Sequence, residues 1–519
     1  MRKNRINRHL KIKTQRIGSM PVVALILLTL PGWILAWSSN LSYAADVAAL
    51  WGAALMFKGI WTFIGYPTEM MRFLRLGAIV LCALQNVSWL TASLIHRFVL
   101  NIPIGRTLRQ IGGVEFSLSA YALAYIFITL FAAMIAYLGS SNWMYKKERR
   151  VTYLLTGLKT IPILKLRNIL AVLLVAEFYL IASGVIGQRS IVVKDTAEGE
   201  RTFSVTLFSI ILPSQILFNA VFLYLLLIKR NFPKFKFSWM ILVVSLSTVL
   251  FLYFNKGRSG LFFSILAFGY WLAFFYQTRP KIWKFALVCS IIYPILSQVL
   301  LFSNFIRSTN AGIENWKGSA IEVVPKAWER FQSSSNLVEQ EKNRTANNLS
   351  TRPLVATPLA MSINLPVERK SFMLGENIIN SLIWVIPGPL FPNKRDYPIQ
   401  EALLYKHFPI GEVDTADSLY LSAYTEFGWI GILFYPLFLF SLWVLVVNFV
   451  FSIRQLPLIG AICIAYFFQL FLLNIGEGAV SNWLIGFRSV LFLFIIGKIW
   501  LLFFAPRKQS QHLPAIEFN

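Results

Sequence analysis

Long apolar stretches recur along almost the whole chain and are separated by shorter polar segments. A run of about 18 or more apolar residues is long enough to cross a bilayer as an α-helix. We therefore predict twelve membrane-spanning helices, at 20–37, 43–65, 76–95, 118–140, 168–187, 205–228, 237–254, 259–276, 285–303, 430–452, 456–473 and 483–504. The expected fold class is an all-α polytopic membrane protein.

One connecting segment, 304–429, is far longer than the others and lies between the ninth and tenth predicted helices. It is long enough to fold as a cap on one side of the membrane. The expected organisation is a basic tail (1–19), nine helices (20–303), this large loop (304–429), three helices (430–504) and a second tail (505–519).

The first half of the large loop contains a predicted amphipathic helix at 321–331. Val324, Trp328 and Phe331 recur there at helical spacing, which places them on one face. The next stretch, 333–350, is polar, which predicts a mobile connection.

The second half of the loop contains an apolar run of ten residues at 377–386. This run is too short to span, so we expect a re-entrant or interfacial helix that Pro387 ends. The prolines that follow predict a stiff, extended arm that carries Lys394 and Arg395. Farther on, Asp417 is expected to cap a helix that leads into the tenth span.

Charge placement gives the predicted topology. The chain carries a formal net charge of +26, and only 14% of its residues are charged, against roughly 25% in soluble proteins. With both termini in the cytoplasm, the cytoplasmic segments sum to +23 and the outer segments to +2. This asymmetry follows the positive-inside rule, so the basic residues need no nucleic acid to explain them.

Several classes of chemistry are disfavoured by the sequence. It contains no Walker A loop, no GxGxxG and no HExxH motif, and it has four histidines and three cysteines, the cysteines all within predicted spans. We therefore expect no metal, no nucleotide cofactor and no disulfide framework. Any chemistry should lie on the outer side, where the large loop is.

Basic residues on the outer side are the first candidate site. Lys256 and Arg258 lie beside glycines in the tight turn that opens the eighth span, where a phosphate group could approach closely. Lys394 and Arg395 on the proline-rich arm and Arg307 beyond the ninth span are further candidates. The structural alternative is that these residues only meet lipid headgroups or form rigid surface turns.

Arg488 lies within the last predicted span, where a charge marks a functional site or a structural ion pair, with Glu177 as its possible partner. Carboxylates on the outer side could act as a general base, and the candidates are Glu376, Asp414, Asp417, Glu426 and Glu477. We select Glu426 and Asp417 as the catalytic candidates. A helix cap or a solvated surface residue is the structural alternative for each.

Together these residues predict a basic groove at the outer membrane surface, with carboxylates nearby. A lipid-linked pyrophosphate suits such a groove, because Lys and Arg neutralise the diphosphate as its bond to a sugar breaks. A carboxylate could then accept the proton of the attacking hydroxyl.

Three local motifs and the overall layout resemble the Wzy-type O-antigen or oligosaccharide repeat-unit polymerases of the O-antigen polymerase–ligase superfamily. The motifs are Lys256-Gly-Arg-Ser-Gly260, Trp384-Val-Ile-Pro-Gly-Pro-Leu-Phe-Pro-Asn-Lys394 and Asp417-Ser-Leu-Tyr-Leu-Ser-Ala-Tyr-Thr-Glu-Phe-Gly-Trp-Ile-Gly431. The layout of twelve spans with a long outer loop between the ninth and tenth is also similar to that family.

The resemblance implies a membrane-embedded glycosyltransferase that needs neither metal nor nucleotide. It would move a growing glycan from undecaprenyl pyrophosphate to a hydroxyl of another lipid-linked repeat unit, for O-antigen, capsule or exopolysaccharide. The implied location is the periplasmic face of a bacterial inner membrane. A chain-length regulator and a flippase are the implied protein partners, beside membrane lipid.

Of three alternatives, a polyprenyl-phosphate-sugar transferase with a catalytic acidic pair in its first outer loop is disfavoured, because residues 38–42 contain no acid. In the related O-antigen ligases a His-Asn pair precedes the Gly-x-x-Gly helix, whereas this chain has Asp417 and Ser418 there, with His407 ten residues upstream. That departure disfavours a ligase. A transporter or flippase for lipid-linked oligosaccharide would predict inverted repeats and several intramembrane charges, and the sequence shows no repeat and few such charges.

Overall fold

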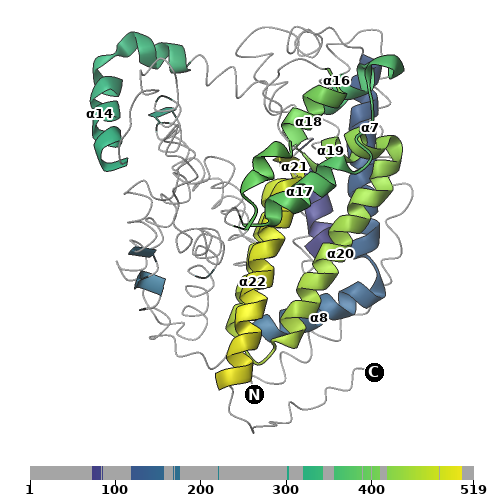
Figure 1. Ribbon diagram of the computed structural model, residues 1–519, viewed down its shortest axis with the longest axis vertical. Helices are drawn as coiled ribbons and strands as arrows, with labels where there is room; N and C mark the ends of the chain where they lie inside the picture. The colour runs from purple at the N-terminus through teal and green to yellow at the C-terminus, as the bar shows by residue number, and fades with distance from the viewer. Residues whose placement is uncertain are drawn as a thin grey trace, which may run out of the picture.

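The computed structural model describes residues 73–82, 118–156, 320–342, 356–387, 390–398, 400–409, 418–477 and 480–504, together with some single residues between 85 and 305. Within these residues every regular element is a helix (Figure 1). The all-helical fold class is therefore confirmed for the described part of the chain.

The described part of the chain contains four long helices: α7 (Leu118–Gly139), α20 (Gly431–Ser452), α21 (Pro457–Glu477) and α22 (Val480–Phe504). Three stretches are long and apolar enough to cross a membrane, Ser119–Gly139, Leu419–Ser452 and Val480–Phe503. These confirm the fourth, tenth and twelfth predicted spans as candidate membrane helices.

The remaining predicted spans are only partly covered. Helix α21 coincides with the eleventh span, and a short apolar helix, Phe73–Cys82, overlaps the start of the third. The first, second and fifth to ninth spans lie outside the described residues, apart from single positions within them.

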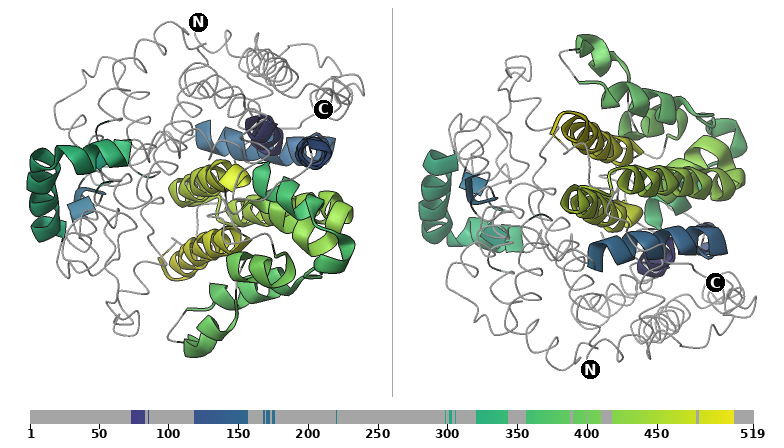
Figure 2. Two further views of the ribbon diagram at one scale, coloured as in Figure 1. Left: turned by 90° about the horizontal axis from the view of Figure 1, so that it is seen from above. Right: turned by 90° about the horizontal axis from the view of Figure 1, so that it is seen from below.

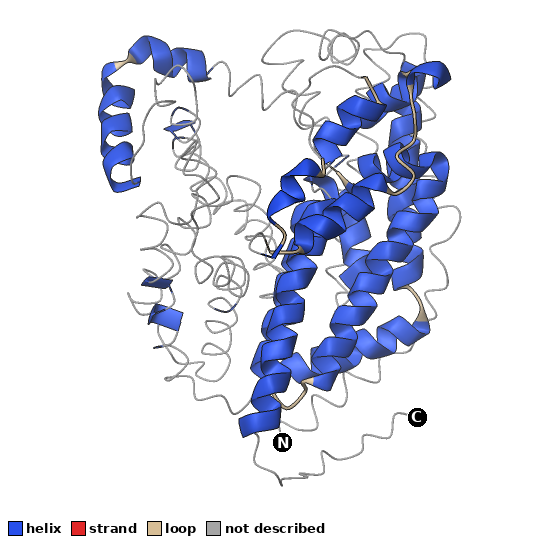
Figure 3. Ribbon diagram, in the orientation of Figure 1, coloured by secondary structure: helices blue, strands red, loops and turns tan. Residues whose placement is uncertain are grey.

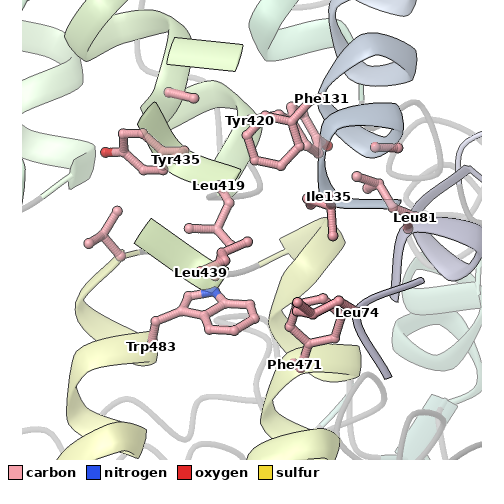
Figure 4. Close-up of a cluster of buried hydrophobic side chains, with 14 of the residues drawn as sticks. Leu74, Leu81, Phe131, Ile135, Leu419, Tyr420, Tyr435, Leu439, Phe471 and Trp483 are labelled. Atoms are coloured by element: carbon pink, nitrogen blue, oxygen red, sulfur yellow. The ribbon is translucent and has the colours of Figure 1, made fainter. Parts of the chain in front are cut away.

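Large side chains fill the space between these helices. Helix α20 packs against both α7 and α21, and α21 packs against α22 (Figure 2). The rings of Trp443 and Phe467 stack 5.5 Å apart, and Phe73 meets Trp443 edge-on at 5.2 Å. Figure 4 shows the neighbouring part of this core, with side chains of Phe131, Ile135, Leu419, Tyr435, Phe471 and Trp483 meeting from different helices. Such van der Waals packing is what holds helices together in lipid.

Helix α8 (Asn142–Thr156) lies across one end of the bundle (Figure 1). The buried carboxylate of Glu148 accepts a hydrogen bond from Trp443 Nε1 at 2.7 Å, and Lys147 Nζ donates to Asn448 Oδ1 at 2.9 Å. These contacts fix α8 to the C-terminal half of α20. The predicted topology places both segments on the cytoplasmic side.

Short helices of the large loop cover the opposite end of the bundle (Figure 3). They are α16 (Thr357–Asn364), η4 (Val367–Arg369), α17 (Glu376–Val385), η6 (Pro392–Asp396), α18 (Gln400–His407) and α19 (Leu419–Phe427). Helix α16 packs against α7, and α17 packs against α22. This part of the loop is thus folded onto the membrane helices.

Helix α14 (Ala320–Ser333) stands apart from the bundle in all views (Figures 1 and 2). It confirms the predicted amphipathic helix, since the rings of Trp328 and Phe331 stack at 5.7 Å and both meet Phe302. Within the polar stretch 333–350, residues 335–342 are helical, and the mobility of this stretch stays a prediction.

The helix cap before the tenth span also differs from the prediction. Ser418, and not Asp417, is the N-cap of α19, since its Oγ accepts a hydrogen bond from Leu421 N at 3.2 Å. Serine fills this role as well as aspartate does. The helix then continues through the 3-10 turn η7 (Gly428–Ile430) into α20.

Candidate functional site

Helix α17 is the element on which most of the described candidate residues converge. Its apolar sequence forms a helix that ends where predicted, with Ile386 as C-cap before Pro387. At about 1.5 Å per residue its ten residues span roughly 15 Å. The helix is confirmed, and its re-entrant or interfacial setting stays a prediction.

Glu426, one of the two predicted catalytic carboxylates, lies at the N-terminal end of α17. Its side chain is fully buried, and Oε1 accepts a hydrogen bond from the backbone N of Ile378 at 3.0 Å. In return, Leu374 N donates to the backbone carbonyl of Glu426 at 3.2 Å. Glu426 therefore joins the start of α17 to the end of α19, and its catalytic role stays a prediction.

Arg488 lies at the other end of α17. From α22, its Nη1 donates to the backbone carbonyl of Val385, the last residue of α17. Its Nε is buried and makes no hydrogen bond to any described residue. The guanidinium thus satisfies a terminal helix carbonyl and keeps a donor for another acceptor. Its predicted partner Glu177 lies outside the described residues.

The proline-rich arm brings Lys394 to the same end of α17. Lys394 Nζ lies 5.1 Å from the centre of the Trp384 ring, within the range of a cation–π contact. Trp384 Nε1 donates to the backbone carbonyl of Tyr397 at 2.8 Å, and this bond folds the arm back onto the helix. The arm is partly the 3-10 helix η6, which corrects the prediction of a fully extended path.

Lys394 and Arg488 therefore contact adjacent residues of α17, Trp384 and Val385, although they come from segments far apart in the sequence. We call these two residues the cation pair. Two of the predicted phosphate-binding residues thus both contact the C-terminal end of α17.

A second group of polar side chains lies near the N-terminal end of α17. Ser371 Oγ lies 2.8 Å from His407 Nδ1, and His407 Nε2 lies 3.0 Å from Glu376 Oε2. Lys406 Nζ donates to the other oxygen of Glu376 at 3.1 Å. We call Ser371, His407 and Glu376 the Ser–His–Glu array.

Glu376 remains a carboxylate in this setting. Partial burial acts to raise the pKa of Glu376, but the hydrogen bonds and charges of Lys406 and His407 outweigh it and hold the pKa below its usual value. Glu376 is also the first residue of α17, where the helix dipole favours a negative charge.

Lys256, Arg258, Arg307 and Asp417 lie outside the described residues, and of Arg395 only the backbone in η6 is described. Among the residues that the structure describes, no group of three His, Cys, Asp or Glu side chains could hold a metal ion.

The sequence did not reveal the Ser–His–Glu array. Glu376 and His407 were visible only as one outer carboxylate and one isolated histidine, and Ser371 belongs to no motif. Their spacing in the chain is irregular, and the fold of the loop alone brings them together.

Comparisons with known proteins add no assignment. No protein-family model, curated protein or solved structure matches this chain.

Proposed function

We propose that this protein is a membrane glycosyltransferase that polymerises oligosaccharide repeat units carried on undecaprenyl pyrophosphate, on the outer face of the membrane. The observation that carries the proposal is the convergence of the cation pair at one end of α17. Two cations fixed by a short, anchored helix form a site for an anion with two phosphates.

The anchoring of α17 supports this role. Glu426 binds its N-terminal end and Arg488 its C-terminal end, so the helix is joined to α19 and to the membrane helix α22. Charge stabilisation of a leaving group is most effective when the charged groups are held in place before the reaction. Glu426 contributes by holding this helix.

The proposed reaction forms one bond and breaks one. The acceptor oxygen bonds to the anomeric carbon of the donor glycan, while the bond from that carbon to the pyrophosphate oxygen breaks and its electron pair leaves with the pyrophosphate. The cation pair, with the predicted cations Lys256, Arg258, Arg307 and Arg395, neutralises this leaving group. Asp417 is the predicted acceptor of the hydroxyl proton.

The surface glycan of a strain that lacks the protein, separated by size on a gel, tests the proposal. We expect a single repeat unit on its final anchor, and restoration of long chains by the wild-type gene. A Lys394→Ala variant should yield at least about tenfold less polymer than the wild type, because one of the charges that neutralise the leaving group is lost. Lys342→Ala, which removes an exposed lysine from the same loop, is the matched control.

Other results would contradict the polymerase. Long polymer that remains on the carrier lipid, with no anchored glycan, would indicate a ligase. An unchanged glycan profile in the deletion strain would exclude both enzymes and favour a transporter. Equal polymer yield from Lys394→Ala and Lys342→Ala would show that the cation pair takes no part in the reaction.

A further inference from the structure

We propose that Ser371 is an activated nucleophile, and that the Ser–His–Glu array is a second reactive site, which cleaves O-acyl esters at the outer membrane surface. This inference is independent of glycan polymerisation. It rests on the continuous chain of short contacts from the serine hydroxyl through the imidazole to the carboxylate, at 2.8 Å and 3.0 Å.

The contacts determine which imidazole nitrogen holds the proton. Glu376 is a carboxylate and only accepts hydrogen bonds, so the neutral His407 ring places its N–H on Nε2, facing Glu376 Oε2. The lone pair of Nδ1 then faces Ser371 Oγ. This is the arrangement in which a histidine removes a proton from serine while a carboxylate stabilises the imidazolium that forms. The two ring nitrogens are exchanged relative to the serine-protease triad, in which Nε2 faces the serine and Nδ1 faces the carboxylate.

A backbone hydrogen bond also holds the serine beside the histidine. Ser371 N donates to the backbone carbonyl of His407 at 3.0 Å, so the two residues are connected through main chain as well as side chain. The next residue, Phe372, packs its ring against Phe408 and Tyr424. The segment with the nucleophile is therefore fixed to α18 and α19.

Access to the site is open on the serine side. Ser371 is exposed, whereas the His407 side chain is only 15% exposed. A substrate can reach the hydroxyl while the base behind it is largely shielded from water. Glu426, in contrast, is fully buried and has no comparable access.

The proposed reaction is an acyl transfer to water. Ser371 Oγ bonds to the ester carbonyl carbon as His407 Nδ1 takes its proton, and the alcohol leaves with that proton when the tetrahedral intermediate collapses. Water then attacks the acyl-serine with the same base and releases the carboxylic acid and the free serine. The backbone N–H of Phe372 directly follows the nucleophile, as one oxyanion donor does in nucleophile elbows.

A fluorophosphonate probe tests this on the full-length protein in detergent micelles, because such probes phosphonylate activated serines and spare ordinary ones. We expect peptide mass spectrometry to locate the adduct on Ser371, and preincubation with p-nitrophenyl acetate to slow its formation. An unmodified Ser371, beside a known serine hydrolase that reacts in the same sample, would overturn the proposal.

Variants separate catalysis from a purely structural role of the same contacts. His407→Ala should slow the labelling of Ser371 by about 100-fold, because the general base is lost. Ser333→Ala, which removes another exposed serine, should leave labelling unchanged. Labelling of Ser371 at the wild-type rate in a folded His407→Ala protein would show that the array only ties the loop together.

Discussion

At the scale of single residues, Glu426 and Arg488 bind the two ends of α17. A helix carries partial positive charge at its N-terminus and partial negative charge at its C-terminus. The Glu426 carboxylate meets the N–H of Ile378 at the first end, and the Arg488 guanidinium meets the carbonyl of Val385 at the second. The Arg488 guanidinium therefore has the sign of charge that stabilises the helix end it contacts, and Glu426 satisfies a backbone N–H at the other end.

Replacing Glu426 tests this arrangement. Glu426→Ala leaves the Ile378 N–H without its acceptor, so we expect a loss of about 1–3 kcal/mol of stability. Glu426→Gln keeps an oxygen acceptor and should lose less. Thermal unfolding in detergent micelles measures the difference, with the exposed Glu368→Ala as control. Equal unfolding midpoints for Glu426→Ala and Glu368→Ala would refute the role of Glu426 as a helix anchor.

The same residues show how far the sequence could lead. Arg488 was recognised as unusual because a charge within an apolar helix is costly, whereas Glu426 was one of several outer carboxylates that could act as a general base. What each of them contacts could not be foreseen, because Glu426 and Ile378 are 48 positions apart and Arg488 and Val385 are 103 apart. A contact over such a separation depends on how the whole loop folds, and no local pattern encodes it.

At the scale of elements, the junction between α19 and α20 depends on two glycines. Gly428 has φ +59°, a conformation that side chains rarely allow. A Cβ on Gly431 would lie 2.0 Å from the backbone oxygen of Ala423, so the chain turns back closely on α19 at this point. The Gly-x-x-Gly spacing in the sequence therefore reflects steric requirements of the turn that leads into a membrane helix.

Substitution of Gly431 gives a sharp test of this junction. In Gly431→Ala the new methyl group meets backbone and not a flexible side chain, so α19 and α20 must separate, and we expect a clearly lower unfolding temperature in detergent. Gly497→Ala is the matched control, because its Cβ would meet Ile453 at an ordinary 3.6 Å. If both variants unfold at the same temperature, the close approach at Gly431 does not constrain the fold.

Prediction of elements succeeded where hydrophobic periodicity was strong. The helices expected at 321–331 and 377–386 are present as α14 and α17. The cap of α19 was assigned one residue too early, because Asp417 and Ser418 are both good N-caps and only the backbone conformation decides between them. The 3-10 helix η6 was missed, since proline fixes φ but leaves ψ free to turn.

At the scale of the whole molecule, the described helices separate two chemically different ends. Helix α8, with its four basic residues and one acid, lies at one end of α20, and the folded part of the large loop lies at the other (Figure 1). The charge asymmetry of the sequence predicts the same separation, with α8 in the cytoplasm and the loop outside. Both the cation pair and the Ser–His–Glu array belong to the loop end.

Cysteine labelling in spheroplasts measures which end faces outward. In a protein without its three natural cysteines, Glu368→Cys should react with a membrane-impermeant maleimide in intact spheroplasts, because it is exposed at the loop end. Lys146→Cys on α8 is also exposed and should react only after the membrane is permeabilised. The opposite pattern would place α17 in the cytoplasm. In the proposed reaction the glycan substrate is carried on lipid at the outer face of the membrane. A cytoplasmic α17 would therefore place the cation pair on the opposite side of the membrane from this substrate.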